Sequence, residues 1–145
     1  MIIPVELYHL EEIIAIENFA FNKPWTKNQF KNDILSYTDS ENWVYIMDEL
    51  VTGYIFGWII HDEFHLNNIA VNKQFQGKGL GGKLLAEVIH YVKAKNGKLV
   101  FLEVMHDNES AIRLYEQNGF ISVGKRKDYT KGKHAILYTL ELNNG

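Results

Sequence analysis

One segment of this 145-residue chain constrains its fold more than any other: four of its eleven glycines fall within Gly77-Lys78-Gly79-Leu80-Gly81-Gly82. An apolar run that ends in Ile69-Ala70-Val71 precedes this segment, and a helical apolar pattern begins at Leu80. Glycine lets a backbone approach a ligand closely, and unpaired N–H groups at a helix start attract an anion. The segment therefore predicts a strand-to-helix turn that binds a phosphate group, rather than a merely flexible loop.

Helical and strand patterns alternate along the rest of the chain. We predict helices at residues 9–20, from a Thr26–Gln29 capping box onward, at 80–95 and at 108–118. We predict strands, rich in β-branched and aromatic residues, at 43–47, 51–60, 64–71, 99–105, 120–126 and 135–142. The first three strands form an antiparallel meander, and a βαβ unit starts near residue 64. The expected fold is α/β, with a mixed central sheet flanked by helices, in one domain over residues 1–145.

Charge and cysteine content exclude several classes of function. The chain has 15 Lys and Arg against 18 Asp and Glu, so it lacks the strong basic footprint of a nucleic-acid binder. Because it has no cysteine, disulfides, thiolate metal sites and a cysteine nucleophile are excluded. The basic run Lys125-Arg126-Lys127 is expected to be a solvated strand end. No G-x-S-x-G elbow supports a serine hydrolase.

Metal and membrane partners are not expected either. His61 and His65 are four residues apart, but on a strand that spacing is about 13 Å, too far for one metal. The most apolar run, residues 53–60, is too short to span a bilayer. The first twelve residues have no basic segment before an apolar one, unlike a signal peptide. We therefore expect a soluble, cytoplasmic protein.

Three phosphate-binding patterns overlap in the glycine segment. Gly77, Gly79 and Gly82 fit the dinucleotide pattern G-x-G-x-x-G, with Glu103 at about the distance of a ribose contact. Residues 77–83 fit most of a Walker A loop, but Leu84 stands where Mg²⁺ chemistry needs a hydroxyl. The third pattern is Q-x-x-G-x-G at residues 74–79. A meander before the βαβ unit, with one helix and a hairpin after it, fits a doubly wound dinucleotide fold poorly.

Through this third pattern the chain resembles the GNAT acetyltransferases, whose loop of this kind wraps the pyrophosphate of acetyl-CoA. The resemblance narrows to the bacterial ribosomal-protein alanine N-acetyltransferases (the RimI family) and covers nearly the whole chain. The similar segments are Ile16-Glu17 with Phe19, Phe21 and Pro24-Trp25-Thr26, residues 65–71, residues 76–81, Leu102-Glu103-Val104, Asn108, Ala111, Leu114-Tyr115 and Gly119-Phe120. One departure is Asp128-Tyr129-Thr130 with His134, where the family commonly has a double tyrosine and an acidic residue.

The resemblance implies a GNAT fold with a βαβ acetyl-CoA-binding core and an identifiable set of site residues. Acetyl-CoA would be the co-substrate, and the acceptor would be the N-terminal alanine of a ribosomal protein, the eighteenth of the small subunit. Glu103 would accept the proton of the amine as it attacks the thioester directly, and Tyr115 would protonate the departing thiolate. The cofactor would bind to the strand backbone of Ile69, Ala70 and Val71, to the loop Gly77, Lys78, Gly79, Leu80, Gly81 and Gly82, and to Asn108, which is also expected to cap a helix.

Structural alternatives exist for each of these roles. Glu103 in its apolar strand could simply face solvent, and Tyr115 could be a core aromatic. Trp25 is expected to fasten the first helices to the sheet, with the wall of a peptide cleft as its alternative; Tyr129 is another candidate for that wall. Two other functions also fit the sequence: a GNAT enzyme acting on a lysine side chain or a small-molecule amine, and a non-catalytic coenzyme A sensor. Glu103 and Tyr115 argue against the sensor.

Overall fold

The structure, a computed structural model, describes residues 1–130 and 132–142, except for the side chains of Asp128 and Thr130. Within these residues, seven strands form one sheet in the order β1-β2-β3-β4-β5-β7-β6. The strands are β1 (Ile2–Pro4), β2 (Ser40–Met47), β3 (Leu50–Ile60), β4 (Glu63–Val71), β5 (Leu99–Met105), β6 (Ile121–Thr130) and β7 (Lys133–Glu141). The helices are η1 (Leu7–His9), α1 (Leu10–Ala20), α2 (Lys27–Leu35), η2 (Lys73–Phe75), α3 (Leu80–Ala94) and α4 (Glu109–Gln117).

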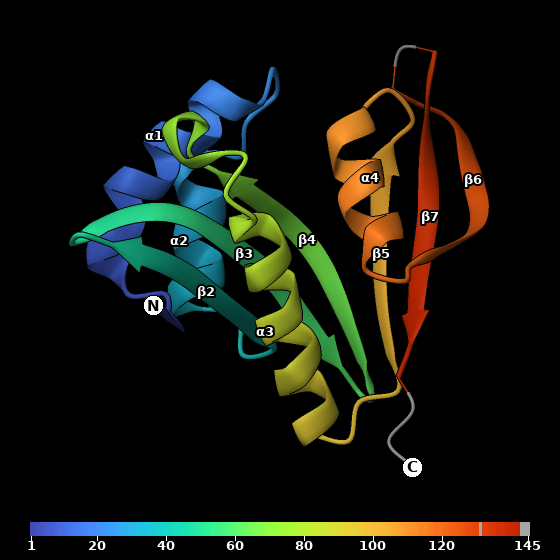
Figure 1. Ribbon diagram of the computed structural model, residues 1–145, viewed down its shortest axis with the longest axis horizontal. Coiled ribbons are helices and arrows are strands. Elements are labelled where there is room, and N and C mark those ends of the chain that lie inside the picture. Colours follow the sequence, from blue (N-terminus) through green and yellow to red (C-terminus); the bar gives the residue numbers. More distant parts are fainter. Residues whose placement is uncertain (131, 143–145) are drawn as a thin grey trace.

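The sheet is mixed because one pair of neighbouring strands runs parallel. β4 and β5, connected through α3, are parallel, and every other neighbouring pair is antiparallel. Figure 1 shows these two strands together at one end and apart at the other. The two strands therefore diverge beyond Leu66 and Leu102, where their pairing stops.

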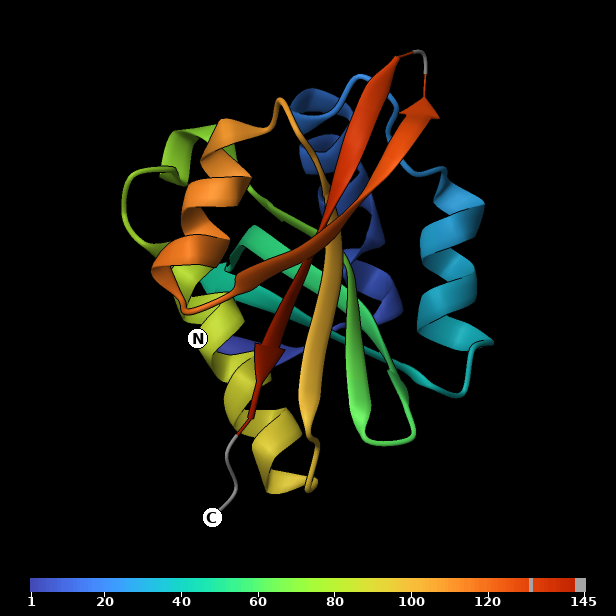
Figure 2. The ribbon, with the colours of Figure 1, turned by 90° about the vertical axis from the view of Figure 1, so that its right-hand side faces the viewer.

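Helices cover both faces of the sheet (Figures 1 and 2). On one face, α3 and α4 pack over the middle strands through a core that includes Leu84, Val88, Leu102 and Tyr115. On the other face, α1 and α2 pack over β2, β3 and β4 through a second core, whose buried members are Leu10, Ile13, Ile16, Phe30, Val44, Val51, Tyr54, Phe56 and Ala70. Each face of the sheet thus buries its own apolar cluster.

The structure confirms the α/β prediction, the meander and the βαβ unit, with small changes at element ends. The short first strand, β1, was not predicted, and the last hairpin extends further, through Thr130 and from Lys133. The capping box is present: Gln29 N–H donates to Thr26 Oγ1 at 3.2 Å, and Thr26 N–H donates to Gln29 Oε1 at 2.7 Å. The ring centroid of Trp25 lies 5.1 Å from that of Phe30 on α2 and 6.1 Å from that of Phe56 on β3, which confirms the fastening role.

Candidate active site

β4 and β5 separate at the end where the glycine segment begins. Their pairing stops at Leu66 and Leu102, and a register shift between β3 and β4 leaves Asn67 unmatched just beyond that point. A bulge of this kind bends a strand and increases its twist. The bend directs residues 68–71 away from β5, so the sheet opens there.

Backbone groups of β4 point into this opening. Asn72 N–H donates to the Thr52 carbonyl on β3 at 2.8 Å, and hydrogen-bonded and non-bonded pairs alternate along antiparallel strands. The N–H and C=O groups of Ile69 and Val71 therefore point away from β3 and toward the opening. The Val71 carbonyl accepts a hydrogen bond from Gln76 Nε2 at 3.2 Å. An extended ligand can pair with this edge as an additional strand would.

The glycine segment forms the start of α3. Gly77 and Gly79 have φ values of +81° and +78°, which side chains disfavour. Gly79 is the N-cap of α3, and Lys83 N–H donates to its carbonyl at 3.1 Å. The N–H groups of residues 80–82 precede this bond and have no acceptor within the helix, so they can donate to an anion. A Cβ atom built on Gly77 or Gly79 would meet nothing within 4 Å, so the space beside the loop is open.

A cavity of about 420 Å³, here called the loop cavity, joins the strand edge to the glycine segment. Every predicted cofactor-binding residue except Lys78 lines it: Ile69, Ala70, Val71, Gly77, Gly79, Leu80, Gly81, Gly82 and Asn108. The Lys78 ammonium lies 5.3 Å from the centroid of the Phe75 ring. Asn108 also caps α4, where its Oδ1 accepts from Ala111 N–H at 3.3 Å, as predicted. Residues that are 39 positions apart in sequence, Ile69 and Asn108, thus meet at one cavity.

Two glutamines can serve as the first residue of the loop pattern. Q-x-x-G-x-G fits residues 74–79, and it also fits residues 76–81. In the second register the glycines are the N-cap Gly79 and Gly81 in the first turn of α3. The glutamine is then Gln76, which bonds to the strand edge. Sequence reasoning missed Gln76 as a site residue, although the repeated pattern was the signal for it.

A second cavity, of about 560 Å³ and here called the outer cavity, adjoins the first. Its walls come from the loop after α1, from the end of β5 and from the start of β7: Ala20, Phe21, Asn22, Lys23, Met105, Asp107, Asn108 and Lys133. Ala20, Phe21 and Asn108 line both cavities. Two ligands, one in each cavity, would therefore meet beside these three residues.

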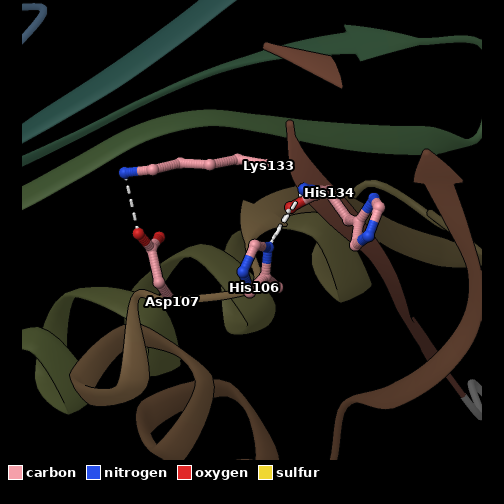
Figure 3. A network of polar contacts seen from close by, with 4 residues as sticks. All are labelled: His106, Asp107, Lys133 and His134. Atoms are coloured by element: carbon pink, nitrogen blue, oxygen red, sulfur yellow. Dashed lines mark hydrogen bonds and ion pairs between the residues drawn. The ribbon is translucent and has the colours of Figure 1, made fainter. Parts of the chain in front are cut away.

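Polar contacts fix the wall of the outer cavity at the last hairpin (Figure 3). Lys133 Nζ lies 2.8 Å from Asp107 Oδ2, and His134 N–H donates to His106 Nδ1 at 3.0 Å. The hydrogen bond from Lys133 is the main reason why the pKa of Asp107 is lowered. These contacts hold the β5–α4 connection against the start of β7. The side chains of Asp128 and Thr130, part of the departure from the family pattern, lie outside what the structure describes.

Glu103 lies on β5, one residue beyond the last pair with β4. Its neighbours Leu102 and Val104 belong to the core under α3 and α4, and side chains alternate along a strand, so Glu103 projects from the opposite face. Arg126 Nη2 donates to Glu103 Oε1 at 2.8 Å. The Glu103 side chain is 25% exposed and lines neither cavity in the described part of the chain.

The basic run of residues 125–127 is exposed, but it lies within β6 rather than at a strand end, which corrects the predicted position. Lys125 and Lys127 are exposed, as predicted. Arg126 between them is exposed as well, and it pairs with Glu103, a contact that the sequence did not predict. The reason is non-local: β6 lies beside β7, and β7 lies beside β5.

Tyr115 lies on α4, two turns after Asn108, but only Asn108 reaches the loop cavity. Tyr115 is 4% exposed, and its ring centroid lies 5.7 Å from that of Phe120 and 6.4 Å from that of Tyr138. Burial raises the pKa of Tyr115 above its ordinary value, so the hydroxyl stays protonated. The ring belongs to the core beside the cavity residue Leu114. Its catalytic role stays a prediction.

A buried carboxylate links α1, β3, β4 and the loop before α2 behind the site. Glu17 on α1 is 1% exposed. Its Oε1 accepts from the Tyr54 hydroxyl at 2.5 Å and from Asn68 Nδ2 at 2.8 Å, and its Oε2 accepts from Trp25 N–H at 2.8 Å. Burial, followed by the charge of Glu17, raises the pKa of Tyr54. Sequence reasoning gave Glu17 no role beyond the family signature, although an acidic residue at a core position of a helix was a signal.

Residues 1–130 and 132–142 contain neither a cluster of metal-binding side chains nor a membrane-spanning helix. No group of three or more His, Asp or Glu side chains could hold a metal ion. No helix in this part of the chain is long and apolar enough to cross a membrane. His65, one of the two histidines considered as ligands, has its Nε2 atom 3.3 Å from Glu63 Oε1.

The opened parallel strand pair and the glycine-rich helix start beside it are the arrangement that the resemblance to acetyltransferases implies. The chain belongs to the acetyltransferase (GNAT) family, whose model matches residues 8–120. The matched range includes every residue that lines the two cavities except Lys133. The GNAT fold expected from the resemblance is confirmed.

Individual relatives are similar over most of their length. The [ribosomal protein bS18]-alanine N-acetyltransferase of Haemophilus influenzae is 33% identical and covers 86% of this chain and 84% of its own. The enzyme of the same name from Escherichia coli K12 is 30% identical, and the match covers 96% of this chain and 95% of that protein. The crystal structure of the ribosomal-protein-S18-alanine N-acetyltransferase from Escherichia coli superposes with a TM-score of 0.91 at 28% identity, over 97% of this chain and 92% of that one.

Proposed function

We propose that this protein transfers the acetyl group of acetyl-CoA to the N-terminal alanine of ribosomal protein bS18. The observation that carries the proposal is the similarity to bS18-alanine N-acetyltransferases along nearly the whole chain, at 30% to 33% identity. Family membership alone supports only acetyl transfer, because GNAT enzymes can differ in the amine they accept. Action on a ribosomal protein would take place in the cytoplasm.

The loop cavity fits acetyl-CoA as co-substrate, which would supply an acetyl thioester. The N–H groups of residues 80–82 face an open space that can take the pyrophosphate. The edge groups of Ile69 and Val71 can pair with the amides of an extended pantetheine arm, and one N–H there can polarise the thioester carbonyl. Gln76 would give up its bond to the Val71 carbonyl when that arm binds.

The outer cavity fits the N-terminal peptide, because it meets the loop cavity where an amine and a thioester can come into contact. Glu103, on the acceptor side of β5, would take a proton from the amine as the N–C bond forms and the C–S bond breaks. Tyr115 would give its proton to the sulfur. Burial keeps that proton on the tyrosine at neutral pH, and the raised pKa makes its release correspondingly more costly.

A pair of peptides tests the proposal. A peptide with the first residues of bS18 and a free N-terminal alanine should be acetylated at least about 100-fold faster than the same peptide with a blocked N-terminus and an internal lysine, since a misplacement of about 1 Å can cost that factor. Mass spectrometry locates the acetyl group. The N-terminus of bS18 from cells with and without the gene should differ by one acetyl group. Equal rates on the lysine peptide, or an unchanged bS18, would contradict the proposal.

A further inference from the structure

The two cavities meet at Ala20, Phe21 and Asn108. If the thioester lies in the loop cavity and the peptide in the outer cavity, the first residue of the peptide must lie beside these three. Phe21 is the only large apolar side chain among them. Its ring therefore limits the space next to the reacting amine.

A backbone hydrogen bond and packing against the core hold Phe21 in place. It is the C-cap of α1, with extended backbone angles of φ −128° and ψ 143°, and its N–H donates to the Glu17 carbonyl at 3.1 Å. Its partly buried ring packs against the core under α1 and α2. Four residues further on, Trp25 N–H is fixed to the Glu17 carboxylate at 2.8 Å. The ring cannot move away without disturbing this core, so it sets a firm limit on size.

We propose that Phe21 is the residue that selects a small first side chain in the acceptor. The inference rests on the proposed function, and it names the part of the site that makes alanine the preferred first residue. Alanine places one methyl group beside the ring. A leucine or methionine would extend into the space that the ring occupies, and its amine would be kept away from the thioester.

The test is a series of otherwise identical peptides that begin with Ala, Ser, Val, Leu or Met. Wild-type protein should prefer Ala and Ser. In Phe21→Ala, kcat/KM for the Leu and Met peptides relative to Ala should rise at least about tenfold, the scale on which pockets discriminate apolar groups. Each ratio compares two peptides on the same variant, so an effect of Phe21 on acetyl-CoA binding in the loop cavity is common to both peptides and cancels. Phe21→Leu should give a smaller change in the same direction, and it provides a second variant if Phe21→Ala does not fold.

Phe19→Ala is the matched control. Phe19 lies two residues away on the last turn of α1, is 69% exposed, and lines neither the loop cavity nor the outer cavity. Its substitution should leave the ratio of Leu to Ala peptides unchanged.

The outcomes separate the inference from the function on which it rests. If the wild-type protein acetylates no alanine peptide, the proposed function fails. If it prefers alanine, but folded Phe21→Ala and Phe21→Leu keep the same preference, the inference is overturned. A uniform loss of rate on all peptides would also overturn it, because the ring would then position the loop without selecting for size.

Discussion

Arg126 Nη2 donates to Glu103 Oε1 at 2.8 Å, from the edge strand β6 and across the intervening strand β7. With side chains that are 57% and 25% exposed, this ion pair contributes little to stability, on the order of 0–1 kcal/mol. The main effect of the ion pair is to fix the position of the Glu103 side chain. The contact involves one carboxylate oxygen and holds the Glu103 side chain on the face opposite α3 and α4.

Replacing Glu103 with Gln keeps the size of the side chain and removes its ability to accept a proton. We expect kcat to fall by about 10²-fold or more at neutral pH while coenzyme A binding stays near normal. The loss should shrink as the pH rises above the amine pKa of about 7.7–8.0, because free amine then forms without help. Rates measured between pH 6.5 and 9.5 check this, with the exposed Glu87→Gln on α3 as control. A defect of constant size at every pH would exclude the role of base.

Replacing Tyr115 with Phe removes only a hydroxyl. Because that hydroxyl is expected to donate a proton to the thiolate, the defect in kcat should persist at high pH, unlike that of Glu103→Gln. Tyr138→Phe is the matched control: its ring is a neighbour in the same core, but its hydroxyl donates to Glu116 Oε2 at 2.9 Å. If Tyr115→Phe and Tyr138→Phe lose activity equally, and only in proportion to lost folded protein, Tyr115 is a core residue and nothing more.

Two substitutions of Gly79 distinguish the effect of an added negative charge on coenzyme A binding from the effect of backbone strain. Both Gly79→Ala and Gly79→Asp place a side chain at φ +78°, so both strain the N-cap of α3. Only the aspartate adds a negative charge beside the N–H groups of residues 80–82. We expect calorimetric titration to show weakened coenzyme A binding in Gly79→Ala and none in Gly79→Asp. Equal affinities in the two variants, or binding of NAD by the wild-type protein instead of coenzyme A, would show that the pyrophosphate site is misassigned.

Local features of the sequence predicted the frame of the site well. The glycine segment has a backbone conformation that few other residues adopt, so its spacing predicts a helix start that the structure confirms. The apolar runs likewise predicted the antiparallel meander. The strand β1 has only three residues, too few for any period to be recognised.

The contacts made between distant residues could not be predicted in this way. The pair of Arg126 with Glu103 depends on the strand order β5-β7-β6, in which the last strand in sequence, β7, lies between β5 and β6. The burial of Glu17 depends on donors from Tyr54 and Asn68, which lie 37 and 51 residues away. Sequence periodicity indicates on which face of a helix or strand a residue lies. It does not indicate which residue, distant in sequence, that side chain will contact.

Glu17 should be the most sensitive polar residue for stability. Glu17→Ala leaves the Tyr54 hydroxyl, the Asn68 amide and Trp25 N–H without their acceptor, and each buried unsatisfied group costs about 1–3 kcal/mol. We expect the free energy of unfolding to fall by several kcal/mol on that basis. Glu11→Ala on the same helix removes an exposed pair with Lys27 at 3.1 Å and should cost no more than about 1 kcal/mol. Urea denaturation of both variants measures the difference, and similar losses would mean that the buried network contributes little.

His9 should make stability fall as the solution becomes acidic. Its side chain is 3% exposed, and its Nδ1 accepts from Glu6 N–H at 2.9 Å, which requires an unprotonated nitrogen. Burial lowers the pKa of His9 below 6.5, against the opposing effects of Glu12 and Glu6. The unfolded chain therefore binds a proton more readily than the folded one. The contribution of neutral His9 is fully present above pH 6.5 and is lost as the pH falls from there through the lower, folded-state pKa.

The matched variant is His9→Asn, whose amide oxygen can still accept from Glu6 N–H but does not titrate in this range. The free energy of unfolding, measured by urea denaturation between pH 7.5 and 5, should decline in the wild-type protein by no more than about 1.4 kcal/mol per pH unit more than in the variant, the limit for one proton. Contributions of other groups, such as the carboxylates, are common to both proteins and cancel in the difference. Parallel curves would show that His9 binds its proton equally well in the folded and unfolded chains, and that its burial is not linked to pH.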